Sequence, residues 1–137
     1  MAKSKVTAKS VTSPHFAVPP EKMAVYRATA RKRWQQDQQV RKERQERAWK
    51  IARQAAIVLK KQFGATRVMV FGSLARGKGF FRSSDIDLAA WGISSEDFFT
   101  AVARLQDLSP EFKIDLVTME HCKPSLRKRI LDEGKAI

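Results

Sequence analysis

The feature that most limits how this chain can fold is a long stretch without glycine or proline. It runs from Glu21 to Phe63 and is rich in Ala, Arg, Lys, Gln and Glu, which favour helices. Pro20 precedes it, where the first turn of a helix tolerates proline, and Gly64 follows it as a C-terminal signal. The stretch therefore predicts a helix that could break near its polar middle, where Val40 is the only apolar residue in QQDQQVRKERQER.

The net charge of +13 is distributed unevenly along the chain. Residues 1–62 hold 16 Lys and Arg against 4 Asp and Glu, whereas residues 63–137 hold 11 against 10. A basic segment of this kind is typical of contact with nucleic acid, so RNA binding through the N-terminal helix is one interpretation. A solvated helical face with paired charges such as Glu43 and Arg47 is the plain alternative.

Apolar residues in the same helix favour a protein partner instead. Met23, Tyr26, Ala30 and Trp34 recur every three to four residues, which is the spacing of one helical face. Isolated aromatic residues such as Trp34 and Trp49 either pack within the domain or anchor another subunit. The helix therefore remains open to three interpretations: a solvated face, an RNA contact, or an interface with a partner or a second copy.

Composition excludes several other classes of protein. No stretch approaches the roughly 20 apolar residues of a membrane span, and the first residues lack a signal-peptide core, so we expect a cytoplasmic protein without membrane contact. A single cysteine, Cys122, cannot form an internal disulfide. With only His15 and His121 besides it, a zinc-type cluster is not expected, and these three residues are interpreted as incidental. Any metal must be held by oxygen atoms.

The second half of the chain alternates between strand and helix patterns. A β-branched run at 66–71 predicts a buried strand, and 85–91 and 112–117 predict two more. Ser94 or Ser95 is expected to cap a helix whose buried side carries Phe98, Phe99, Val102 and Leu105. Pro124 starts a final helix that ends near Gly134. This order predicts an α/β fold in which a small mixed sheet of three strands is flanked by helices.

Three aspartates on these strands are candidate metal ligands. Period-two alternation sends Asp85 and Asp87 to one face of their strand, opposite Ile86 and Leu88. Asp115 lies on the polar face of the third strand. Clustered carboxylates suit Mg²⁺, which binds through a few carboxylates together with substrate phosphates. We therefore predict that the three aspartates hold two Mg²⁺ ions and that Asp115 helps to deprotonate an attacking hydroxyl.

A glycine-containing loop precedes the aspartates and suggests a phosphate site. Gly72 allows the backbone to approach a triphosphate closely, and Ser73 offers a hydroxyl and amide donors at the start of a predicted short helix. Arg76, Lys78 and Arg82 supply positive charge nearby. Gly72, Ser73 and Arg76 are the candidate nucleotide-binding residues.

Taken together, the segment VFGSLARGKGFFRSSDIDL and the later Ile114-Asp115-Leu116 resemble the DNA polymerase beta-type nucleotidyltransferase superfamily. The similarity is greatest to its minimal nucleotidyltransferase branch and spans roughly Ala48 to the C-terminus. The chain departs from the usual pattern in one respect, because eleven residues separate Ser73 from Asp85 and Phe80-Phe81 replaces a polar turn.

The resemblance implies a polymerase beta-like fold and transfer of a nucleoside monophosphate from a nucleoside triphosphate, with ATP as donor. It implies that Gly72 and Ser73 hold the β- and γ-phosphates, that Asp85 and Asp87 bind metal, and that Asp115 is the third catalytic carboxylate. In the minimal branch, the implied acceptor is a tyrosine of a partner HEPN-domain toxin, which the antitoxin silences by adenylylation. Transfer to a small molecule or an RNA end, and a non-catalytic module that binds toxin or RNA, are the alternatives.

These features divide the chain into three predicted parts. Residues 1–20, with three prolines and no periodic apolar pattern, are predicted to be a flexible tail. Residues 21–47 are predicted to form a basic helical extension that could also support a homo-oligomer. Residues 48–137 are predicted to form the nucleotidyltransferase domain.

Overall fold

The computed structural model describes residues 19–137. The predicted tail, residues 1–20, therefore lies outside the described residues except for its last two prolines. Within the described part, no helix is both long enough and apolar enough to cross a membrane. The described chain divides between Gln39 and Val40 into two units.

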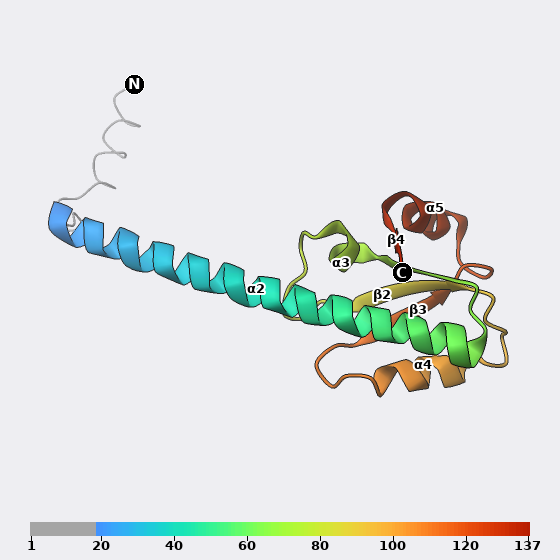
Figure 1. The fold of residues 1–137 in the computed structure, drawn as a ribbon. Coiled ribbons are helices and arrows are strands. Elements are labelled where there is room, and N and C mark those ends of the chain that lie inside the picture. The colour runs from blue at the N-terminus through green and yellow to red at the C-terminus, as the bar shows by residue number, and fades with distance from the viewer. Residues whose placement is uncertain (1–18) are drawn as a thin grey trace, which may run out of the picture. The chain divides into compact units, whose positions relative to one another are not determined.

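The first helix, α2 (Pro20–Phe63), is continuous, so the predicted break in its polar middle does not occur (Figure 1). The polar middle is rich in charged side chains three and four positions apart, a spacing that supports a helix without tertiary contacts. Residues 24–40 of α2 are exposed throughout. Among them, the large apolar side chains of Tyr26 and Trp34 are solvent-accessible.

The mixed sheet consists of four strands in the order β3-β2-β1-β4. β1 (Arg67–Phe71) pairs antiparallel with β2 (Ile86–Trp91), and β2 pairs in parallel with β3 (Ile114–Thr118). The two-residue strand β4 (Lys135–Ala136), which pairs antiparallel with β1, was not expected from the sequence. The prediction of three strands was wrong because a Lys-Ala pair lacks the apolar or β-branched pattern that indicates a strand.

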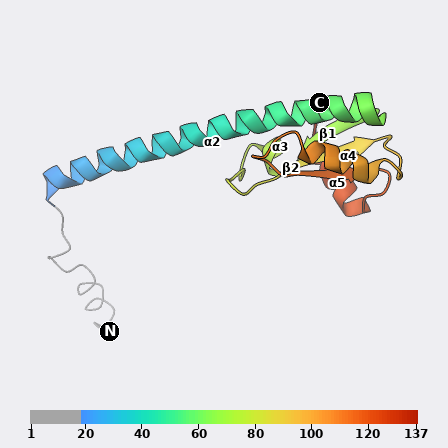
Figure 2. The same cartoon turned by 90° about the horizontal axis from the view of Figure 1, so that it is seen from below.

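Helices cover both faces of the sheet (Figures 1 and 2). The second half of α2 and helix α4 (Phe98–Gln106) pack on one face through a single core cluster. Small residues at Ala48, Ala52 and Ala55 let α2 approach the strands closely. Helix α5 (Pro124–Glu133) packs on the other face, where Ile130 is fully buried. The short helix α3 (Gly72–Arg76) contacts β1, β2 and α5.

One predicted core residue of α4 lies at the surface. Phe98 is partly buried and Leu105 fully buried, as predicted, but the side chain of Phe99 is 79% exposed. The buried side of α4 follows positions 98, 101, 102 and 105, and a residue one position after Phe98 is rotated by about 100° away from it. The prediction for Phe99 was therefore wrong because position 99 lies outside the stripe of helical positions that faces the sheet.

Candidate active site

Two of the three predicted metal ligands are direct neighbours across the sheet. Asp87 of β2 is in register with Asp115 of β3, so parallel pairing holds the two residues side by side. Asp85 lies immediately before β2 and, two positions from Asp87, on the same side of the chain. The structure thus brings together the three aspartates at the end of the sheet where β1 ends and β2 and β3 begin.

The electrostatics of this cluster are unfavourable without a cation. Burial, followed by the charges of Asp115 and Asp85, raises the pKa of Asp87 to about 6, while Arg76 opposes this effect. Burial and a hydrogen bond with Asp85 raise the pKa of Asp115, and Lys113 opposes that change from 3.9 Å. Both carboxyl groups therefore resist ionisation, first because they are partly buried and second because other acidic groups lie close to them.

Gly72 is positioned against the carboxylates by the start of α3. Its φ is +74°, a conformation that L-residues with side chains rarely adopt. A Cβ atom at this position would overlap the Oδ2 atom of Asp87. Phe71, the preceding residue, is paired in register with Asp87. The glycine therefore allows the backbone at the β1–α3 junction to lie directly beside the carboxylate.

The other predicted nucleotide-binding residues lie on the same short helix. Ser73 is in the first turn of α3, and Arg76 is in its last. Arg76 is close enough to Asp87 to lower its pKa, and its guanidinium also forms an ion pair with Glu133 of α5 at 3.5 Å. The sequence did not predict this partner, because nothing in the spacing of residues 76 and 133 indicates that α3 and α5 are adjacent. The structure thus gathers Gly72, Ser73 and Arg76 beside the aspartates.

The donor set fits Mg²⁺ in chemistry. Carboxylate oxygens are the ligands that Mg²⁺ prefers, and a divalent cation would offset both the burial and the neighbouring negative charges that raise the pKa of Asp87. Within residues 19–137, no three His, Cys, Asp or Glu side chains converge closely enough to hold an ion by themselves. A substrate phosphate or water would have to complete the coordination sphere, which is how Mg²⁺ is commonly bound.

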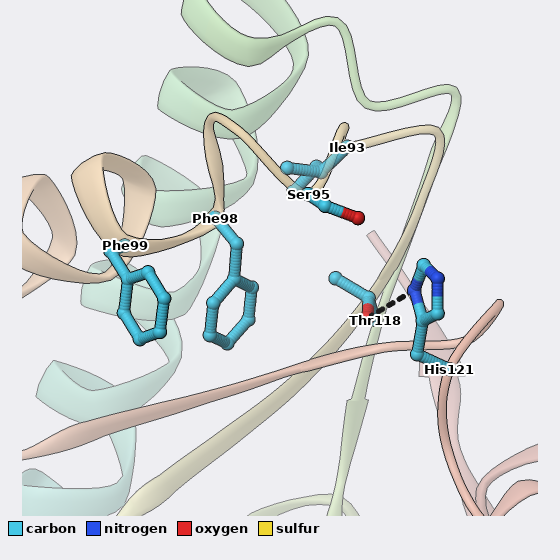
Figure 3. A pocket seen from close by; sticks show the side chains of 6 residues that line it. All are labelled: Ile93, Ser95, Phe98, Phe99, Thr118 and His121. Atoms are coloured by element: carbon cyan, nitrogen blue, oxygen red, sulfur yellow. Dashed lines mark hydrogen bonds between the residues drawn. The ribbon is translucent and has the colours of Figure 1, made fainter.

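An apolar surface lies next to Asp115. A pocket of about 460 Å³ is lined by Asp115 and Lys113 together with apolar residues of α4 and β3. Phe98 and Phe99 also line a second pocket of about 330 Å³, shown in Figure 3.

The second pocket includes His121, a residue interpreted from the sequence as incidental. His121 lies at its rim, where its Nδ1 is 3.5 Å from the Thr118 hydroxyl (Figure 3). Cys122 is a partly buried free thiol, and His15 lies outside the described residues. The pair Phe98-Phe99 was the sequence signal for this surface, because position 99 lies outside the buried stripe formed by positions 98, 101, 102 and 105.

Comparison with known proteins identifies the family and the fold. Residues 53–137 match the family described as Polymerase beta, Nucleotidyltransferase. The chain belongs to this nucleotidyltransferase family. The matched residues include the strands and loops that carry the aspartates and Gly72, and the superfamily inferred from the sequence motifs is confirmed. No curated protein matches the chain significantly.

Solved structures share the nucleotidyltransferase fold. A chain from the crystal structure of a mutant MntA–HpeT toxin–antitoxin is 17% identical and has a TM-score of 0.53, with 62% of this chain and 70% of that chain covered. A chain from a toxin–antitoxin crystal structure with AMP-PNP is 22% identical and has a TM-score of 0.52, with 61% and 69% covered.

A chain from a complex of tri-AMPylated Shewanella oneidensis HEPN toxin with MNT antitoxin is more distant. It is 17% identical, with 70% of each chain covered and a TM-score of 0.43.

Proposed function

We propose that this nucleotidyltransferase moves AMP from ATP to an acceptor hydroxyl with the help of Mg²⁺. The observation that carries the proposal is the register pair of Asp87 and Asp115, with Asp85 beside it and the Gly72 backbone against it. Asp85, Asp87 and Asp115 would hold up to two Mg²⁺ ions. The metal would neutralise negative charge on the phosphates and on the attacking and leaving oxygens.

The reaction would be an in-line displacement at the α-phosphorus. The acceptor oxygen forms a bond to phosphorus, the bond from the α-phosphorus to the bridging oxygen breaks, and pyrophosphate leaves. The hydroxyl proton passes to a carboxylate, for which we propose Asp115 because its raised pKa makes it a better proton acceptor than an ordinary aspartate. The balanced products are the adenylylated acceptor and pyrophosphate.

We propose that Gly72, Ser73 and Arg76 bind the triphosphate. Gly72 supplies a backbone without a side chain at the point of closest approach, Ser73 supplies a hydroxyl, and Arg76 supplies positive charge close to Asp87. ATP as donor is supported by the sequence resemblance and by the presence of AMP-PNP in one structure of similar fold. An ATP donor also agrees with the predicted cytoplasmic location.

For the acceptor, we propose a tyrosine of a HEPN-domain toxin, with this protein as its antitoxin. The sequence resemblance implies this partner, and the two structures with TM-scores of 0.53 and 0.52 described above are toxin–antitoxin structures. The apolar pocket that contains both Asp115 and Phe99 would accept an aromatic side chain next to the candidate base. The catalytic domain would comprise residues 48–137, a range that contains the residues matched by the family, 53–137.

We further propose that residues 21–47 contribute to assembly with the toxin or with a second copy. Trp34 is 63% exposed on a helical segment without buried residues, so its apolar surface has no cover among the described residues. Replacing Trp34 with Ala should weaken such an assembly, whereas binding of RNA by the basic residues would respond mainly to salt.

The direct test is to incubate the full chain with ATP labelled at the α-phosphate, Mg²⁺ and a HEPN toxin or cell lysate. We expect labelled protein, with the label on a tyrosine when the modified peptide is sequenced by mass spectrometry. Asp115→Asn should abolish labelling, whereas Asp132→Asn, an exposed aspartate on α5, should leave it unchanged. Label found only on RNA or on a small molecule would contradict the protein acceptor but retain the transfer reaction.

A further inference from the structure

A third pocket lies between α2 and the loop that follows α3. It encloses about 420 Å³ and is lined mainly by four arginines and two phenylalanines, Arg41, Arg44, Arg47, Arg82, Phe80 and Phe81. We refer to these six residues as the arginine pocket. The first three arginines come from α2, and the other residues come from the loop between α3 and β2. The volume falls within the range of small-molecule sites.

The arginine pocket contains more positive charge than its surroundings neutralise. Glu111 is its acidic residue, and this carboxylate binds both Arg44, at 3.2 Å, and Arg47, at 2.7 Å. Arg41 and Arg82 form no ion pair with any residue in the described part of the chain. The pocket is therefore built to attract an anion, and guanidinium groups match the geometry of phosphate oxygens.

Arg44 shows that the hydrogen bonding of the pocket is incomplete. Its side chain is only 15% exposed, and its guanidinium donates to the carbonyl oxygen of Arg82 at 2.6 Å and lies 4.5 Å from the centre of the Phe112 ring. Its Nε–H group is buried and finds no acceptor among residues 19–137. An unpaired buried donor is costly, so the packing that holds Arg44 in the pocket wall is maintained without a full set of hydrogen bonds.

Phe81 adds an aromatic surface to this charged site. Its side chain is 56% exposed although the neighbouring Phe80 is buried. The guanidinium of Arg41 lies 5.7 Å from the centre of the Phe81 ring. The loop is fixed in this position because the hydroxyl of Ser84 accepts a hydrogen bond from the Phe81 amide at 2.8 Å and donates one to the Gly79 carbonyl. An exposed ring beside arginines is the arrangement on which nucleobases stack.

We propose that the arginine pocket binds a nucleotide unit, with a phosphate group on Arg41 and Arg82 and the base stacked on Phe81. The unit belongs either to a free nucleotide or to a single-stranded RNA. An acidic peptide would satisfy the arginines but would have no need for the exposed ring. This site is separate from the proposed catalytic centre, because none of its lining residues belongs to the aspartate cluster or to α3.

The test measures binding of a short fluorescein-labelled oligouridine to the full chain by fluorescence anisotropy, without Mg²⁺ and at low salt. We expect Arg41→Gln and Arg82→Gln each to weaken binding by about tenfold and to lower the slope of log affinity against log salt by about one. Phe81→Ala should weaken binding by about fivefold or more through lost stacking. The matched control is Arg53→Gln, which removes the same charge from an exposed position on α2 outside the pocket.

Competition identifies the source of the nucleotide. Displacement of the probe by UMP, and not by uridine or inorganic phosphate alone, supports a free-nucleotide site, whereas displacement only by unlabelled oligouridine supports an RNA strand. The proposal is overturned if Arg53→Gln weakens binding as much as Arg41→Gln, if Phe81→Ala has no effect, or if the wild type does not bind the probe. Equal displacement by polyglutamate would also overturn it and would indicate an acidic peptide. Circular dichroism of each variant establishes that the fold is retained.

Discussion

The two faces of the sheet are made from the same strands but carry opposite chemistry. The face toward α2 and α4 presents Val68, Val70, Ile86, Leu88 and Ile114, all of which are essentially inaccessible to solvent. The face toward α5 presents Met69, Phe71 and Ala89, but Asp87 and Asp115 occupy the alternate positions at one end. The face toward α2 and α4 therefore packs in the apolar core and stabilises the fold. The face toward α5 carries the carboxylates at one end.

The largest expected effect is a loss of activity when carboxylates are removed from the end of the face toward α5. Asp85→Asn together with Asp87→Asn should lower nucleotidyl transfer by roughly 10²–10³-fold or more, because the proposed ligands of the metal are lost. The fold should persist, since the buried face of β2 is unchanged. Transfer of labelled AMP to the acceptor gives the rate, and thermal unfolding checks the fold.

The double variant should also be at least as stable as the wild type, because like-charge repulsion is removed. A clear loss of stability, or activity near that of the wild type, would show that the carboxylates are structural.

A substitution on the face toward α2 and α4 should lower the stability of the protein. Leu88→Ala removes a fully buried side chain next to Asp87 and should destabilise the protein by about 2–5 kcal/mol. The free energy of unfolding, measured by urea denaturation, gives this cost. Asp87→Asn is the matched control because it changes the neighbouring position on the same strand. If both variants lost the same stability, the two faces would not have separate roles.

Gly72 and Gly77, at the two ends of α3, allow a comparison of how much stability each loses when it is replaced by alanine. Gly72→Ala and Gly77→Ala impose the same strain, since both glycines have φ near +70°, but only the first would place a Cβ against Asp87. We therefore expect Gly72→Ala to be less stable than Gly77→Ala by about 1–3 kcal/mol, which is the usual cost of overpacking. Equal free energies of unfolding for the two variants would show that Asp87 moves aside freely.

The last comparison concerns the dependence of stability on pH. Because the pKa of Asp87 rises from 3.8 to about 6 on folding, the folded protein binds this proton more tightly than the unfolded chain does. The stability linked to this proton is fully present below about pH 4 and is lost as the pH rises to about 6. Asp115 acts in the same direction.

Urea denaturation across this pH range measures the change, and Asp132→Asn serves as a control with an exposed aspartate. Asp87→Asn should flatten the profile, and Mg²⁺ should reduce the loss at higher pH if it binds the ionised carboxylates. A profile for Asp87→Asn that is as steep as that of the wild type would assign the dependence to other groups.

Much of the fold could be predicted because local patterns decide it. The interval between Pro20 and Gly64 bounds the long helix, and the alternation around Asp87 defines both its strand and the face on which it lies. The pairing of Asp87 with Asp115 could not be predicted from local patterns, because it depends on strand order and register, which tertiary packing determines. The sequence motif indicated that the residues belong together but not how they meet.

What the sequence did not predict depends on contacts between distant segments. The pairing of Arg76 with Glu133 and the convergence of Arg44 and Arg82 on one pocket join residues that have no spacing relationship. β4 was missed because a two-residue strand carries too little pattern, and Phe99 was misplaced because hydrophobicity alone did not account for helical phase. From the sequence, the arginines of α2 indicated only a basic helix. The loop that completes their pocket was noted only because Phe80-Phe81 departs from the usual motif.

The register pairing of Asp87 with Asp115 has an evolutionary consequence. Because backbone hydrogen bonds between β2 and β3 set the spacing of these carboxylates, substitutions on α4 or in the loop before β2 can reshape the surroundings without moving the reactive groups. A duplicated copy could therefore acquire a new acceptor by changing its surface while it retained the same chemistry. Only an insertion within β2 or β3 would disturb the pair, so we expect lineages to diversify in length everywhere except in these two strands.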